Sequence, residues 1–387
     1  MPQPSPNDRA FSRMNAVRPA WTGMQRLGDL PGLARQVVLH AGPPFSGFAR
    51  IPAAVRNSLI NMVIREGWAG THERAAALLR SGSVAIEPAQ DHAVFVPLAG
   101  AAGPSTMLIR VTDQASGQAA FSPINEGMAL CTRLGILHPD LVDHLRWLDE
   151  TLAPWLSRRL ARVALPLFPI LRSAIAREDD CHSRTMAGSE ALVAALLGVM
   201  PAAPGDETIL SFLQGAPAFA LNVWMAMCGL IAAAAAGTEG STLVTHAGGN
   251  GVDFGYRLAG DPGRWHLTPA PAIHGDIDPR FADGSPLPAL GDSAIVDILG
   301  LGGQILASAA PVRVALAHHL PPDPGNRPLH FLHGRLDGFD GPAATDAAKV
   351  RAGGIGPVIL LGMIDGAGRL GRVGGGCVIS DAATFPN

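Results

Sequence analysis

The spacing of apolar residues predicts helices in two parts of the chain. Apolar positions recur at helical intervals across residues 56–80, and Thr71 stands where an N-cap residue of a second helix belongs. Residues 139–200 form the clearest helical block, and leucines mark its apolar face: Leu141, Leu145, Leu148 and Leu152. Prolines divide this block into short helices: Pro154, Pro166 and Pro169.

Strand-like apolar runs lie on both sides of the helical block. Residues 84–86 and 107–112 precede it, and residues 357–363 follow it near the end of the chain. Residues 366–376 are rich in glycine, which predicts a loop. Residues 321–347 are rich in Pro, Gly and Asp and are predicted to be irregular.

The strongest short-range signal is a hairpin at Asn250-Gly251. Strand-like runs at residues 241–246 and 252–257 flank it, and both central residues tolerate the positive φ of a tight turn. Polar residues cluster around it: His246, Asn250, Asp253, Arg257, Arg264 and His266. This cluster indicates either a site for a small anionic or amide-bearing ligand, or a surface hairpin with ordinary solvated groups.

The order of these elements predicts an α+β protein in which a layered α/β lobe precedes a small all-helical block. We place an N-terminal arm at residues 1–25, either loosely held or extended to contact a partner, and the N-terminal lobe at 26–130. The helical domain follows at 131–205, and the C-terminal lobe occupies 206–387. A length of 387 residues suits two or three structural units.

One apolar segment raises the question of a membrane span. Residues 216–236 are almost wholly apolar and about long enough to cross a bilayer. Asn222 and Gly229 interrupt the segment and no Lys or Arg flanks it, so we interpret it as a closely packed core helix. The first eight residues do not have the pattern of a secretory signal. We expect no membrane partner.

Charge and cysteine content exclude some classes of ligand, site and cellular location. Only 16% of residues are charged and the formal net charge is -3, so the chain has no basic field for nucleic acid. Lys349 is the single lysine, which leaves anion recognition to arginines or backbone N–H groups. The four cysteines form no CxxC pair, which disfavours a zinc site and favours a reducing cytoplasm. We expect neither a metal nor a cofactor.

Further polar residues stand at breaks between apolar elements. The segment 178–185 carries His182 beside Asp179 and Asp180, which form either an acid/base pair or half of a metal site. His40 ends an apolar run just before paired prolines, where a histidine either faces a cleft or is simply buried.

Two polar pairs sit at expected helix starts. Asn125 and Glu126 either cap the following helix or line a site at its N-terminal end. Asp292-Ser293 are predicted to cap a helix over residues 294–299, whose free N–H groups would suit an anion.

Taken together, these segments resemble the YlbE-like family, which includes AllG, a subunit of oxamate carbamoyltransferase. The matching segments are short and keep the same order: residues 40–44, 124–127, 180–184, Asn222 with 225–226, 250–255, 264–265, 291–303 and 354–376. The resemblance therefore covers nearly the whole chain.

This resemblance implies two mixed α/β lobes flanking a small all-helical middle domain, and carbamoyl transfer from carbamoyl phosphate to oxamate, oxalurate or an analogous small carboxylate or amide. It also implies partner subunits, one of them resembling an acyl-CoA synthetase, and we expect a homo-oligomer. We assign catalysis to His182, His40 and Asp180. Substrate binding is assigned to eight residues: Asn125, Glu126, Asn250, Gly251, Arg257, Arg264, Asp292 and Ser293.

Two other functions stay open at this point. The same pocket could serve an amidohydrolase or lyase of a ureido compound that uses water as the acceptor. Alternatively, the chain is a non-catalytic subunit that shapes the site of a partner in a multi-subunit transferase.

Overall fold

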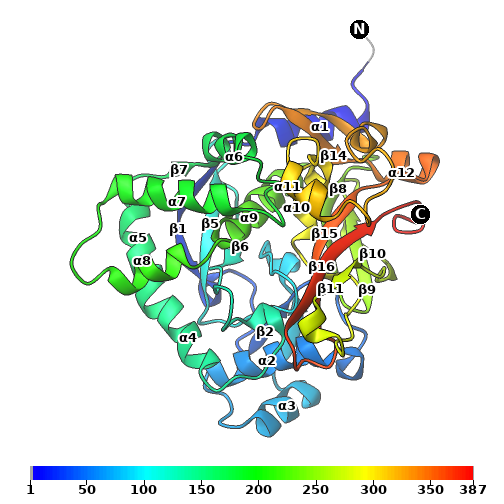
Figure 1. Ribbon diagram of the computed structural model, residues 1–387. Coiled ribbons are helices and arrows are strands. Elements are labelled where there is room, and N and C mark those ends of the chain that lie inside the picture. The colour runs from blue at the N-terminus through cyan, green and yellow to red at the C-terminus, as the bar shows by residue number, and fades with distance from the viewer. Residues whose placement is uncertain (1–2, 387) are drawn as a thin grey trace.

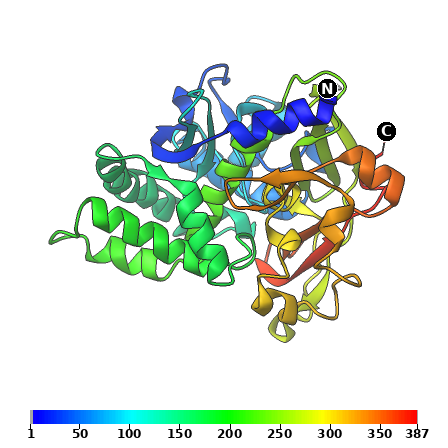
Figure 2. The ribbon, with the colours of Figure 1, turned by 90° about the horizontal axis from the view of Figure 1, so that it is seen from above.

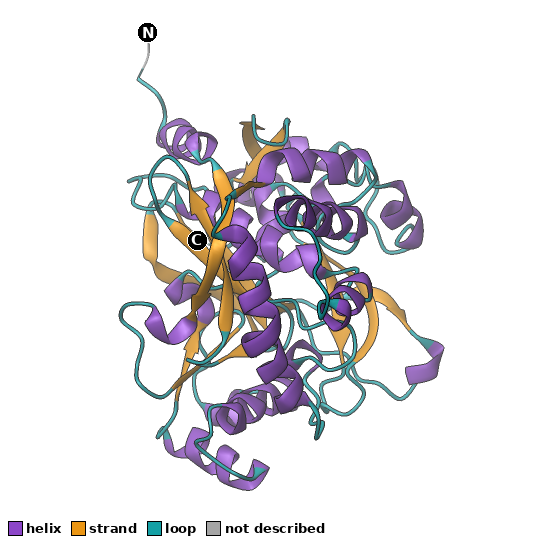
Figure 3. Ribbon diagram, turned by 90° about the vertical axis from the view of Figure 1, so that its left-hand side faces the viewer, coloured by secondary structure: helices purple, strands orange, loops and turns teal. Residues whose placement is uncertain are grey.

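The computed structural model describes residues 3–386 and mixes helices with several small sheets (Figure 1). This confirms the predicted α+β class. The strands fall into separate groups with helices between them, and no single sheet runs through the described residues (Figure 3). The predicted division into an arm and three domains stays a prediction.

Two sheets form the N-terminal half. The larger has the antiparallel order β6-β5-β1-β7, and the smaller has the order β3-β2-β4 with β2 and β3 parallel. Their strands are β1 (Pro19–Arg26), β2 (Val37–His40), β3 (Ala85–Pro88), β4 (Ala101–Ala102), β5 (Met107–Asp113), β6 (Ala119–Pro123) and β7 (Leu165–Pro166). Burial largely alternates along β5, as expected for a strand with one face on the core.

Two predicted helices occur in this half, α2 (Ala53–Arg65) and α3 (His72–Ser81). The side chain of Thr71 accepts a hydrogen bond from the N–H of Arg74, so the predicted N-cap is confirmed.

The predicted helical block is confirmed and lies to one side of the molecule (Figures 1 and 2). It contains α4 (Leu141–Trp147), α5 (Ala153–Leu160), α6 (Leu167–Ala176) and α7 (Met186–Val199), and α8 (Glu207–Gln214) follows. All four leucines of the predicted apolar face are buried. The predicted break at Pro154 is absent, because a π-helical turn at Leu148–Leu152 joins α4 to α5 and the proline occupies the tolerated first turn.

Helix α9 (Phe219–Ala233) is the centre of the fold. Every residue from Phe219 to Ala232 is buried, and the helix contacts β5, β6, β8 (Val244–Asn250), α7 and α10 (Ala294–Leu299). The predicted core helix is therefore confirmed. Among the described residues no single helix is long and apolar enough to cross a membrane, although α8 and α9 together, bent by 74°, pass by length and composition.

The C-terminal half contains a four-stranded sheet, a three-stranded sheet and a two-stranded ribbon. Their strands are β8 (Val244–Asn250), β9 (Asp253–Leu258), β10 (Asp261–Pro269), β11 (His274–Ile277), β12 (Leu290–Gly291), β13 (Leu332–Leu336), β14 (Gly341–Thr345), β15 (Val358–Ile364) and β16 (Arg372–Ile379). Its helices are α10 (Ala294–Leu299), α11 (Ala310–Ala315) and α12 (Ala347–Gly353). The predicted hairpin is confirmed as β8 and β9, with Gly251 at φ +83° in the turn.

Residues near the start form regular structure: α1 (Pro6–Ala16) begins with a capping box between Ser5 and Asp8, and β1 joins the larger N-terminal sheet. Two expectations about local structure are corrected. The segment predicted to be irregular contains β13 and β14. The glycine-rich segment is partly strand, since β16 begins at Arg372, and its glycines let the backbone of β11 come close.

Candidate functional site

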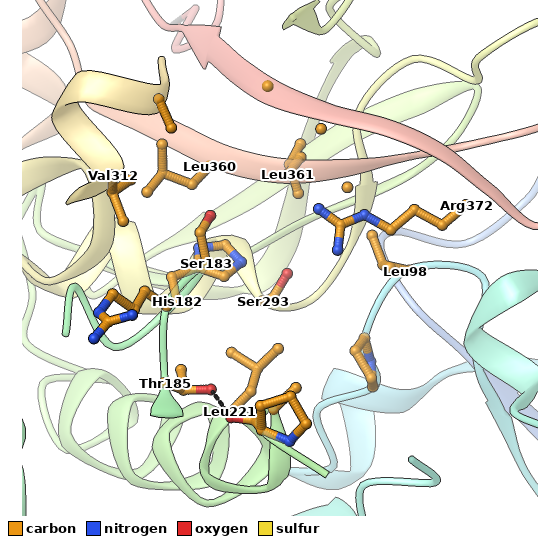
Figure 4. Close-up of a pocket in the computed structure, with 18 of the residues that line it drawn as sticks. Leu98, His182, Ser183, Thr185, Leu221, Ser293, Val312, Leu360, Leu361 and Arg372 are labelled. Carbon is orange, nitrogen blue, oxygen red and sulfur yellow. Dashed lines mark hydrogen bonds between the residues drawn. The ribbon is translucent and has the colours of Figure 1, made fainter. Parts of the chain in front are cut away.

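A cavity of about 470 Å³ opens where the loop before α7, the start of α9, helix α11 and strands β15 and β16 meet (Figure 4). Its polar lining consists of three arginines, one histidine and three hydroxyl groups: Arg133, Arg184, Arg372, His182, Ser183, Thr185 and Ser293. The rest of the lining is apolar or glycine, and no Asp or Glu side chain of the described residues takes part. Such a lining favours an anionic ligand.

His182 stands on the loop between α6 and α7, and its ring reaches into the C-terminal half. Its Nδ1 lies 2.6 Å from Oδ2 of Asp297 on α10. The other oxygen of Asp297 accepts the N–H of Gly303 at 2.8 Å, so the carboxylate is held from both sides. Because Nδ1 is engaged, Nε2 is the ring nitrogen left for a ligand.

The structure corrects the predicted partner of His182. Oδ1 of Asp180 accepts the N–H groups of His182 and Arg184 at 2.6 and 3.2 Å, and Oδ2 of Asp179 accepts the N–H of Gly188 at 2.8 Å. Short acidic side chains bond to nearby backbone groups, and here they shape the loop instead of pairing with the imidazole. The catalytic role assigned to Asp180 stays a prediction.

The surroundings of His182 favour its protonated form. Burial would lower the pKa of His182, but the charge and hydrogen bond of Asp297 and the charge of Asp180 outweigh it and raise the pKa. Cys181 beside it has φ +68°, a conformation that is uncommon for residues other than glycine. Burial raises the pKa of Cys181 well above its usual value, so this thiol stays protonated and is a poor nucleophile.

The three cavity arginines differ in how far their charge is neutralised. Nε of Arg184 lies 3.5 Å from Oδ1 of Asp179, which is a weak ion pair. Neither Arg133 nor Arg372 forms an ion pair among the described residues. Their charges are therefore available to a ligand.

Arg133 and Arg372 are held in place by backbone carbonyls. Arg133 donates from Nη2 to the carbonyl of Gly127, and Arg372 donates from Nε to the carbonyl of Gly374 at 2.9 Å. Arg372 remains accessible to solvent, yet it is enclosed enough that burial, together with the charge of Arg133, lowers its pKa. Two like charges near each other create a strongly positive end of the cavity.

Asn125 and Glu126 lie in a narrow hollow of about 10 Å³ that also borders Arg133. Nδ2 of Asn125 donates to Oδ1 of Asn222 at 2.9 Å, and Glu126 accepts the hydroxyl of Thr132 at 2.8 Å. The next helical turn begins at Thr132 after the N-cap residue Cys131, and Oε2 of Glu126 accepts the N–H of Arg133 in this turn at 3.5 Å. These residues support the wall of the main cavity behind Arg133.

Burial raises the pKa of Glu126 to about 7, although the hydrogen bond from Thr132 and the charge of Arg133 act in the opposite direction. The folded protein thus keeps a proton that the unfolded chain releases near its usual pKa of 4.5. The contribution of Glu126 to the free energy of unfolding therefore falls as pH rises from about 4.5 to about 7.

We predict that Glu126→Gln removes this part of the pH dependence, because glutamine has no proton to lose. Urea unfolding from pH 5 to 8 measures it, and the variant should gain stability relative to the wild type toward pH 8. The exposed Glu239→Gln is the matched control. Parallel stability curves for wild type and Glu126→Gln would contradict the prediction.

Asp292 and Ser293 have separate roles. Asp292 does not cap α10: its carboxylate accepts the N–H of Gly42 at 2.7 Å, the N–H of Val96 at 2.8 Å and Nε2 of Gln90 at 2.5 Å. Asp292 is fully buried, and these donors from other segments occupy its carboxylate, which is why it does not cap α10. Burial raises the pKa of Asp292 to about 7. Ser293 lines the cavity instead.

His40 is buried away from the cavity. Its Nδ1 lies 2.8 Å from the carbonyl oxygen of Ala41, and its ring centroid lies 4.6 Å from that of Phe45. Burial lowers the pKa of His40 to about 4, so the ring is neutral at physiological pH. Its predicted part in catalysis stays a prediction, and His40 does not border the cavity lining.

The polar residues of the hairpin do not line the cavity. Asn250 shapes the turn, because its Oδ1 accepts the N–H groups of Val252 and Asp253 at 2.9 and 2.8 Å. Arg257 pairs with Asp91, and Arg264 is exposed. The substrate-binding roles assigned to Asn250, Gly251, Arg257 and Arg264 stay predictions, while the contacts of Asn250 and Arg257 are those of a stable hairpin.

Sequence reasoning missed four residues of the site: Arg133, Arg184, Arg372 and Asp297. Asp297 carried a usable signal, because it is the one charged residue in the apolar run of α10. Arg184 lies in the loop that the sequence had already singled out. Nothing local marks Arg133 or Arg372. No group of three or more His, Cys, Asp or Glu side chains in residues 3–386 could hold a metal ion.

Comparisons with known proteins bear on this site. The family model of AllG, described as oxamate carbamoyltransferase subunit AllG, matches residues 84–293, more than half of the chain. An uncharacterized protein of Escherichia coli (strain K12), YahG, is 31% identical over 401 residues, covering 98% of this chain and 84% of its own. The oxamate carbamoyltransferase subunit AllG of the same organism is 26% identical over 398 residues, covering 98% and 95%.

One solved structure has the same fold over the whole length. The crystal structure of a conserved protein of unknown function from Enterococcus faecalis V583 superposes with a TM-score of 0.92 at 26% identity. The match covers 98% of this chain and 95% of that one.

Proposed function

The chain belongs to the AllG family, and from this premise we propose that its arginine-lined cavity is the substrate site of a carbamoyltransferase-type enzyme or enzyme subunit. The substrates we propose are carbamoyl phosphate and a small carboxylate that carries an amide nitrogen, such as oxamate. One observation carries the proposal: three arginines and His182, whose Nδ1 is held by Asp297 outside the lining, line one cavity that has no carboxylate of the described residues in its lining.

The charges of these substrates suit the cavity. Carbamoyl phosphate bears a phosphate dianion and oxamate bears a carboxylate, and guanidinium groups bind both in bidentate fashion. Holding the two anions side by side against their mutual repulsion converts a bimolecular encounter into a reaction within one site. A cavity of about 470 Å³ has room for both small molecules.

The reaction requires the acceptor nitrogen to lose a proton and the departing phosphate to gain one, and His182 can relay it. The amide nitrogen of the acceptor attacks the carbamoyl carbon, a C–N bond forms, and the bond from that carbon to the phosphate oxygen breaks. The nitrogen loses a proton to Nε2 of His182, which then passes it to the departing phosphate. Asp297 holds Nδ1–H and stabilises the imidazolium that forms, so it is a positioning residue.

Assembly and location follow from the same family membership. AllG is described as a subunit, which supports partner subunits for this chain. We propose that one partner resembles an acyl-CoA synthetase and that the chain forms a homo-oligomer. We also propose a cytoplasmic location, supported by four cysteines that are all free and buried.

The test is an assay of the purified full chain with carbamoyl phosphate and oxamate. We expect equal amounts of phosphate and carbamoylated oxamate, and we expect Arg372→Gln to lower kcat/KM about 10-fold or more because a charged contact to substrate is lost. Arg158→Gln removes an exposed arginine on α5 and should leave turnover unchanged.

Three results would change the proposal. Ammonia and carbon dioxide in place of a carbamoylated product would indicate a hydrolase. Turnover that appears only after a co-purifying chain is added would indicate a subunit that completes its site with a partner. Loss of activity in Arg264→Gln with normal activity in Arg372→Gln would move the site to the hairpin.

A further inference from the structure

We propose that one end of the cavity is a subsite for a phosphoryl dianion, formed by Arg133, Arg372 and Ser293. The inference deepens the proposed function, because carbamoyl phosphate is its source of the dianion there. The chemistry of the subsite also fits free inorganic phosphate, which is the product of the same reaction.

The guanidinium charges of Arg133 and Arg372 are not neutralised by an ion pair within residues 3–386. Arg133 is 6% exposed and its Nε is buried without a hydrogen-bond partner, while Arg372 lies close enough to feel its charge. Neither guanidinium has a carboxylate partner among the described residues. Arg133 is buried beside Glu126, whose pKa burial raises to about 7, whereas Arg372 is more open to solvent. Like charges near each other are costly, and a dianion between them would neutralise both.

The hydroxyl group of Ser293 also lacks a hydrogen-bond partner in the described part of the chain. Ser293 is 1% exposed, borders the cavity, and its Oγ has no hydrogen-bond partner. A buried hydroxyl without a partner destabilises a protein, so its presence at a cavity points to a ligand that accepts its proton. Figure 4 shows Ser293 and the guanidinium of Arg372 facing the same cavity.

Two glycines leave space for the side chain of Arg372. A Cβ on Gly375 would lie 2.9 Å from Nη2 of Arg372, and a Cβ on Gly362 would lie 3.3 Å from its Nε. Strands β15 and β16 thus carry glycine at the two positions where a side chain would crowd the guanidinium. This packing keeps Arg372 directed at the cavity.

The order of groups along the cavity determines where each end of the two substrates lies. Ser293 is the N-cap residue of α10, one helical turn before Asp297, and lines the same cavity as the His182 that Asp297 holds (Figure 4). Arg184 follows His182 on the loop and is partly neutralised by Asp179, which suits a singly charged carboxylate. The phosphate therefore lies at the Arg133–Arg372 end, the acceptor carboxylate lies at Arg184, and the reacting carbon lies beside His182.

The experiment is calorimetric titration of the full chain with inorganic phosphate and, separately, with oxamate. We expect Arg372→Gln to weaken phosphate binding about 10- to 100-fold, since a charge-assisted hydrogen bond is lost. Arg184→Gln should weaken phosphate binding less than about threefold and weaken oxamate binding more strongly. Carbamoyl phosphate should show the same ranking of variants as inorganic phosphate.

Two milder variants distinguish a loss of phosphate binding from misfolding. Ser293→Ala removes only the hydroxyl, and Gly375→Ala displaces the guanidinium of Arg372 without changing any charge, because only that flexible side chain stands in the way. Both should weaken phosphate binding while circular dichroism and thermal unfolding stay as in the wild type.

The inference is overturned if the wild type does not bind phosphate, or if Arg184→Gln harms phosphate binding as much as Arg372→Gln. The proposed function can fail separately. Phosphate binding with the expected ranking but no carbamoyl transfer would reject the transferase reaction and keep the subsite.

Discussion

Replacing His182 by asparagine is expected to lower kcat/KM for carbamoyl transfer by about 10²- to 10⁴-fold, the usual contribution of a positioned proton-transfer group. His182 is the one imidazole in the cavity lining, which contains no Asp, Glu, Cys or Tyr side chain of the described residues, and asparagine cannot accept the proton of the acceptor nitrogen. The assay with carbamoyl phosphate and oxamate measures the effect. The exposed His72→Asn is the matched control and should retain full activity.

The pH profile separates this role from a structural one. The pKa of His182 is raised by Asp297, so wild-type kcat/KM should rise with pH through a value above 6.5 as the imidazole becomes a base. Asp297→Asn removes the carboxylate charge, lowers the pKa of His182 and should shift this rise to lower pH. An unshifted profile in Asp297→Asn, or full turnover in His182→Asn, would remove His182 from the mechanism.

Replacing Asp292 by alanine is expected to cost about 3–5 kcal/mol in the free energy of unfolding, because three buried donors lose their acceptor. The donors are the N–H groups of Gly42 and Val96 and the amide of Gln90, which join three segments to the start of α10. Urea unfolding at pH 7 measures the loss.

The control for Asp292→Ala is Asp283→Ala, at an exposed position without a side-chain hydrogen bond in the described structure. Its free energy of unfolding should stay within about 0.5 kcal/mol of the wild type. A similarly small change in Asp292→Ala would show that water or a shifted side chain satisfies the three donors.

Local sequence rules predicted local structure well. Asn250-Gly251 gave the hairpin because backbone preferences act within a few residues, and Thr71 gave a helix cap for the same reason. The missed helix α1 also had a local signal, the Ser5 and Asp8 capping box.

The site was harder to predict because tertiary contacts create it. His182 was a candidate from the sequence, but its partner Asp297 lies 115 positions away, while two nearer aspartates bond to backbone N–H groups. The clustered hairpin arginines attracted the substrate-binding assignment, yet Arg257 is occupied by Asp91. Charge that is concentrated in sequence and charge left unpaired in space are different properties, and the second depends on the fold.

The separate origin of the three cavity arginines has a mechanical consequence. Arg133 follows the N-terminal sheet, Arg184 precedes α7 and Arg372 begins β16, so each belongs to a different part of the chain. A phosphate bound by Arg133 and Arg372 acts as a reversible cross-link between two of these parts, closing a long loop without a covalent bond, and the acceptor carboxylate at Arg184 engages the third. Phosphate departure would then release the segments of Arg133 and Arg372 from each other, so that emptying the site and loosening the molecule are a single event.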